Sequence, residues 1–114
     1  MRRILATFAF VVAAGGATAQ DTGPSYAEVS AYTCAVLPKI YGTQRYAEVI
    51  DPAINYIMER GPVTEQLGSA CNIGDYIKAE CRGKPRRTIG EAVDSLIDKV
   101  SRRAPLPKIP NCGA

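Results

Sequence analysis

Cysteine is the residue type whose chemistry is easiest to interpret in this sequence. The four cysteines are Cys34, Cys71, Cys81 and Cys112. No two of them form a C-x-x-C pair and the sequence contains no histidine, so a zinc site is not indicated. An even number of cysteines in a small exported chain is typical of disulfides. We therefore predict two disulfides, and at this point all three possible pairings stay open.

Catalytic chemistry lacks its usual components. No serine, cysteine or pair of carboxylates has a histidine or another evident base to activate it. The sequence also shows no pattern typical of a cofactor or metal site. We therefore expect a protein that is not an enzyme and that carries no cofactor.

The N-terminal residues have the organisation of a secretory signal peptide. Arg2 and Arg3 precede an apolar run over residues 4–14, which is shorter than the roughly 20 residues that span a bilayer. The small residues Ala17-Thr18-Ala19 then predict cleavage between Ala19 and Gln20. A membrane anchor or a buried N-terminal helix is the alternative. We expect residues 1–19 to be the signal peptide, residues 20–114 to be the mature domain, and the location to be periplasmic or secreted.

Cleavage would remove most of the apparent basic character. Without Arg2 and Arg3, the basic side chains fall from 14 to 12 against 11 acidic ones, a net charge of +1. This near balance gives no support to a nucleic-acid partner. No later segment is apolar enough to span a membrane, so we expect a soluble mature protein without a membrane span.

Helical periodicity runs through residues 25–103. Ser25 and Glu28 form a capping-box pattern that opens a first helix, which we expect to end near Pro38. The clearest period follows over residues 43–60, where Pro52 is either a kink or the start of a new helix.

The second half of the chain predicts three further elements. Weaker periodicity over residues 62–81 indicates two short helices, and Thr88 with Glu91 forms a second capping box before the last helix. Three prolines favour an extended tail over residues 104–114, which Cys112 would pin to the helices. We predict an all-α, single-domain bundle of four to five short helices, stapled by disulfides, with an extended proline-rich C-terminal tail.

Two groups of residues are candidate interaction surfaces. The first is an apolar stripe that could bind clients or a second copy of the chain, although such a stripe is more often core: Tyr46, Ile50, Ile54, Ile57 and Met58. The second is a basic loop that could bind an acidic partner or anionic lipid head groups, although a solvated turn is the commoner explanation: Arg82, Lys84, Arg86 and Arg87.

Cysteine placement resembles that of the HdeA/HdeB acid-stress chaperones. The resemblance rests on three features: the motif Tyr32-Thr33-Cys34, the 47-residue separation from Cys34 to Cys81, and the order of a short helix before Cys81 and a long one after it. The likeness covers residues 32–100. It implies a Cys34–Cys81 disulfide, which leaves Cys71 for Cys112. The second cysteine pair, the proline-rich tail and the basic loop depart from the family pattern.

The resemblance implies a periplasmic protein that can form a homodimer, opens in acid and binds unfolded client proteins. Because histidine is absent, such a switch would operate on carboxylates well below neutral pH. The second cysteine pair would restrict how far the chain opens. The alternative functions are a secreted inhibitor or immunity protein that binds a toxin or a cell-wall hydrolase, and a structural accessory that binds one specific envelope partner.

Overall fold

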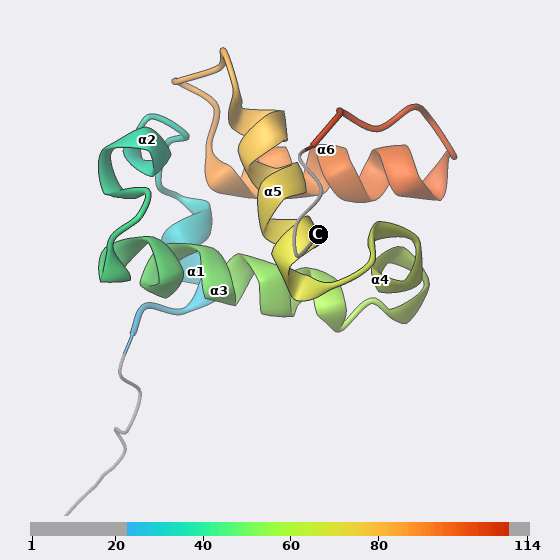
Figure 1. The fold of residues 1–114 in the computed structure, drawn as a ribbon, viewed down its shortest axis with the longest axis horizontal. Coiled ribbons are helices and arrows are strands. Elements are labelled where there is room, and N and C mark those ends of the chain that lie inside the picture. Colours follow the sequence, from blue (N-terminus) through green and yellow to red (C-terminus); the bar gives the residue numbers. More distant parts are fainter. Residues whose placement is uncertain (1–22, 110–114) are drawn as a thin grey trace, which may run out of the picture.

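Six α-helices form the regular structure of residues 23–109, the part of the chain that the computed structural model describes (Figure 1). They are α1 Tyr26–Ser30, α2 Val36–Ile40, α3 Gln44–Met58, α4 Gly61–Leu67, α5 Ala70–Cys81 and α6 Ile89–Ser101. The all-α prediction is confirmed. The predicted signal peptide, its cleavage site between Ala19 and Gln20, and Cys112 lie outside the described residues.

The structure has more helices than the four to five predicted, because the first predicted helix is divided into two short helices, α1 and α2. Between them the backbone turns away to pair with the chain before α6, in an isolated antiparallel bridge between Thr33 and Thr88. The Cys34 N–H donates to the Arg87 carbonyl at 2.7 Å, and the Ile89 N–H donates to the Tyr32 carbonyl at 2.9 Å. These bonds replace the ones a continuous helix would make.

Pro38 does not end a helix, contrary to the prediction. It is the third residue of α2, within the first turn, where backbone N–H groups have no partner inside the helix and a missing N–H costs little. Pro52 behaves differently, since α3 continues through it as one helix over Gln44–Met58.

The remaining predicted helices are present. The two short helices before Cys81 are α4 and α5, and the last helix is α6. The Thr88 capping box is complete: the Thr88 hydroxyl accepts from the Glu91 N–H at 3.0 Å, and the Glu91 carboxylate accepts from the Thr88 N–H at 3.0 Å. Before α1, the Ser25 hydroxyl accepts from the Glu28 N–H at 3.2 Å.

The core lies where α3, α5 and α6 pack together, with α1, α2 and α4 around it (Figure 1). The largest fully buried side chains come mainly from these three helices: Val49 and Ile57 of α3, Ile73 and Ile77 of α5, and Ile89, Val93 and Leu96 of α6. Each such side chain stabilises the fold by about 1.5–3 kcal/mol through removal of apolar surface from water.

Most of the apolar stripe offered as an interaction surface is core. Ile50, Ile54 and Ile57 are buried, and Tyr46 is half-buried against the same cluster. Met58 alone of the five is exposed, with 44% of its surface accessible. The folded protein therefore presents little of this stripe at its surface, because three of the five residues are buried.

Close approach of α1 and α6 depends on Gly90. A Cβ atom at this position would lie 3.0 Å from the Ser30 Cβ and 3.1 Å from the Ser30 carbonyl oxygen. One of these contacts is with backbone, which cannot rotate away. The absence of a side chain at Gly90 is what lets the two helices pack at this distance.

Replacement of Gly90 by alanine should destabilise the protein by about 1–2 kcal/mol, because the added methyl group overpacks the α1–α6 contact. Gly61→Ala is the matched control, since a Cβ there meets nothing within 4 Å. Urea unfolding of both variants checks this. Equal stabilities for the two variants would contradict the packing argument.

Candidate functional site

The Cys34–Cys81 disulfide joins the N-terminal part of the chain to the end of α5. Both cysteines are buried, and their Cα atoms are 5.3 Å apart. This is the pairing that the family resemblance implies. Cys71 is also disulfide-bonded, while Cys112, its predicted partner, lies outside the described residues, so that second pairing stays a prediction.

Glu80 precedes Cys81 and is the one buried charged residue among residues 23–109, with 2% of its surface exposed. Its two carboxylate oxygens are bound to different cations. Oε1 accepts a hydrogen bond from Arg87 at 3.1 Å, and Oε2 accepts one from Lys99 at 2.8 Å. Arg87 also donates to the Glu80 carbonyl at 2.9 Å. One carboxylate therefore ties α5 to α6 and to the loop between them.

The pKa of Glu80 reflects two opposing effects. Burial raises it, whereas hydrogen bonds from Lys99 and Ser95, the Lys99 charge and the bond from Arg87 lower it, and the net result is a pKa below the usual glutamate value. A carboxyl group with a lowered pKa stabilises the native state above its ordinary pKa of about 4.3. That stabilisation is lost as the pH falls through the lower value of the folded state.

The prediction of a basic loop grouped Arg87 with three other cations. Because Arg87 is paired with Glu80, it is not part of a free basic surface. Its guanidinium is bound to Glu80, and the Arg87 side chain is 24% exposed. Arg82, Lys84 and Arg86 are exposed, and no carboxylate within residues 23–109 forms an ion pair with any of them.

Burial of Glu80 was not predicted from the sequence, although the spacing of residues in α5 contains a signal for it. It follows Ile73 and Ile77 at helical spacing, so it falls on the buried face of α5. Its partner Lys99 is 19 residues away, which no local pattern reveals.

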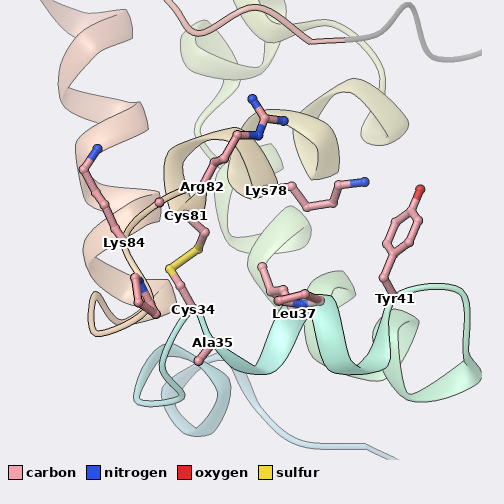
Figure 2. A pocket seen from close by; sticks show the side chains of 11 residues that line it. Cys34, Ala35, Leu37, Tyr41, Lys78, Cys81, Arg82 and Lys84 are labelled. Carbon is pink, nitrogen blue, oxygen red and sulfur yellow. A yellow bond between two sulfur atoms is a disulfide. The ribbon is translucent and has the colours of Figure 1, made fainter.

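A groove of about 480 Å³ lies beside the disulfide, between α2, the end of α5 and the following loop (Figure 2). Its apolar floor and walls are formed by Cys34, Ala35, Leu37, Pro38, Cys81 and Pro85. Tyr41 stands at one end, and three cations, Lys78, Arg82 and Lys84, lie around it. Among residues 23–109, no acidic residue lines this groove.

The rim of the groove has a defined arrangement. Lys78 points toward Tyr41, with its ammonium nitrogen 3.7 Å from the ring centroid and 3.6 Å from the Asp75 carboxylate (Figure 2). Tyr41 is 59% exposed. Gly83 has a φ of +74°, a backbone conformation that glycine adopts readily, in the turn that separates Arg82 from Lys84.

A second, smaller hollow of about 310 Å³ lies between α3 and α5. Tyr46 lines it together with Cys71, Asp51 and Asp75. Burial, followed by the charge of Asp75, raises the pKa of Tyr46 above its usual value. Tyr46 is thus uncharged at any physiological pH.

Comparison with known proteins gives no assignment: no protein-family model, no curated protein and no solved structure matches this chain. Within residues 23–109, no three or more potential ligand side chains gather as a metal site would require. No helix in that part of the chain combines the length and apolar character needed to cross a membrane.

Replacement of Glu80 by glutamine tests whether the buried charge stabilises the fold. Glutamine keeps the shape but removes the charge, leaving Lys99 and Arg87 without their counter-ion. We expect a loss of about 3 kcal/mol at pH 7. The difference from the unmodified protein should shrink as the pH falls below the ordinary glutamate pKa of about 4.3, because Glu80 then binds a proton more readily in the unfolded chain than in the folded protein.

Urea unfolding at several pH values measures this effect. Glu65→Gln, an exposed position on α4, is the control and should change stability by less than about 0.5 kcal/mol. A difference between Glu80→Gln and the unmodified protein that stays constant from pH 7 to pH 3 would show that the charge is not responsible.

Proposed function

We propose that the protein is a small exported acid-stress chaperone that opens at low pH and binds unfolded proteins through its apolar helix faces. The single observation that carries the proposal is the buried Glu80 carboxylate, held between Arg87 and Lys99. It makes the packing of α5 against α6 depend on an ionised acid.

Protonation of Glu80 would remove the attraction that holds this part of the molecule together. Arg87 and Lys99 would keep their positive charges and repel each other, while their side chains, 24% and 32% exposed, can move into solvent. The α5–α6 contact would then loosen. The apolar residues of α3, α5 and α6 that it covers would become available to clients.

The net charge of the chain supports opening in the same pH range. Protonation of all 11 carboxylates changes the side-chain charge of residues 20–114 from +1 to +12. Self-repulsion of this size favours an expanded chain and keeps it soluble. Many proteins gain positive charge in acid, so this property supports the proposal only together with Glu80.

The Cys34–Cys81 disulfide suits a protein that must open and refold. A cross-link over 47 residues reduces the entropy of the unfolded chain and stabilises the native state by about 4 kcal/mol in the chain-entropy treatment. Cys34 and Cys81 would stay linked in the opened chain, so the chain would expose apolar faces without unfolding completely. A second disulfide at Cys71 limits the opening further.

The disulfide's contribution is tested by the double variant Cys34→Ala/Cys81→Ala. We expect a loss of about 4 kcal/mol in unfolding free energy at pH 7. The pH of half-unfolding should also rise, because less acid is then needed to open the chain. A variant as stable as the oxidised protein would contradict this role.

Chaperone activity is tested with oxidised protein of residues 20–114, the predicted mature chain. Circular dichroism and sedimentation from pH 7 to pH 2 should show loss of helix packing below about pH 4. In the same acid range the protein should suppress aggregation of an unrelated enzyme, and the Glu80→Gln variant should open at higher pH.

The proposal would be wrong if the protein stayed folded and monomeric to pH 2 and left client aggregation unchanged. An inhibitor or immunity protein, the alternative function, would also leave aggregation unchanged but would bind one specific partner at neutral pH. Sedimentation at pH 7 additionally shows whether the folded form is a homodimer.

A further inference from the structure

We infer that the groove beside the Cys34–Cys81 disulfide is a binding site for a free single-chain anionic amphiphile, namely an aliphatic carboxylate of the fatty-acid class. This site is distinct from the Glu80 contacts. It would operate in the folded protein at neutral pH.

The floor of the groove fits an aliphatic chain. Leu37, Pro38, Pro85 and the disulfide form its surface. Its volume of about 480 Å³ falls in the range of 300–1,000 Å³ that is usual for small-molecule sites. Such sites are mostly apolar, with few polar groups that orient the ligand.

Charge at the rim selects an anionic head group. Lys78, Arg82 and Lys84 surround an apolar surface that no carboxylate of the described part of the chain lines. Lys78 is engaged with Asp75 and Tyr41, whereas no carboxylate of residues 23–109 pairs with Arg82 or Lys84. A guanidinium binds a carboxylate through two parallel hydrogen bonds, so Arg82 is the best-suited partner for the head group.

Backbone hydrogen bonding favours an amphiphile over an extended peptide. A peptide needs main-chain partners, and several main-chain groups that line the groove are already hydrogen-bonded within the protein. Ala35 donates to the Pro85 carbonyl at 3.2 Å, Leu37 to the Cys34 carbonyl at 3.1 Å, and Lys84 to the Cys81 carbonyl at 3.0 Å. Pro38 and Pro85 have no N–H to offer. An aliphatic chain requires none of these bonds.

The test is isothermal titration calorimetry at pH 7 with oxidised protein of residues 20–114. Dodecanoate, kept below its micelle concentration, is the probe. We expect saturable 1:1 binding. Acetate, which lacks the chain, and dodecyltrimethylammonium, which reverses the charge, should bind at least tenfold more weakly.

Two double variants separate the groove from general positive charge. Arg82→Gln/Lys84→Gln should weaken dodecanoate binding at least tenfold. Lys39→Gln/Arg86→Gln removes the same charge from exposed positions that do not line the groove, and it should bind as the unmodified protein does. Tyr41→Ala, which shortens one wall, should weaken binding severalfold. Circular dichroism confirms that each variant is folded.

Three results would overturn the inference: no saturable binding of dodecanoate, equal weakening in both double variants, or binding only to anionic phospholipid vesicles and not to the free carboxylate. The last result would indicate a membrane surface as the ligand. All measurements are made at pH 7, where the chaperone proposal also requires a folded protein. The two proposals therefore fail independently.

Discussion

The ionised carboxylate of Glu80 lies where α5, α6 and their connecting loop meet. A buried charge is unfavourable unless it is paired, and here each oxygen has its own cation, Arg87 at 3.1 Å and Lys99 at 2.8 Å. Since α5 and α6 form the most extensive helix contact of the described residues, their packing and this ion triad are coupled. Acid can act directly on this contact, because the Glu80 carboxylate is ionisable whereas the apolar side chains of the core are not.

The disulfide and the Glu80 contacts are neighbours in sequence, yet they lie on different sides of α5 and have different consequences. Cys81 links α5 to the segment before α2, and this link forms one wall of the groove. Glu80 faces α6 instead. The loop after α5 serves both, since Arg82 and Lys84 line the groove whereas Arg87 turns to Glu80. This division explains why one short basic segment combines exposed and paired cations.

Sequence patterns predicted the elements whose stabilising contacts are local. The Thr88–Glu91 box and the period of α6 are examples, as is α3. The break between α1 and α2 could not be predicted, because it depends on hydrogen bonds from residues 32–35 to residues 85–89. Burial of Glu80 likewise depends on its contact with Lys99. The groove forms because α2 meets a loop that is distant from it in the sequence. The apolar stripe of α3 showed the right periodicity, but only packing shows that it faces inward.

The central claim is that protonation of Glu80 opens the structure. The most direct measurement is a carbon-13 NMR titration of the Glu80 side-chain carboxyl, recorded together with amide hydrogen exchange in α5 and α6. Our account predicts a Glu80 pKa below the usual glutamate range and loss of amide protection in both helices over the pH interval in which Glu80 gains its proton. Titration of Glu80 with protection in α5 and α6 unchanged would contradict it.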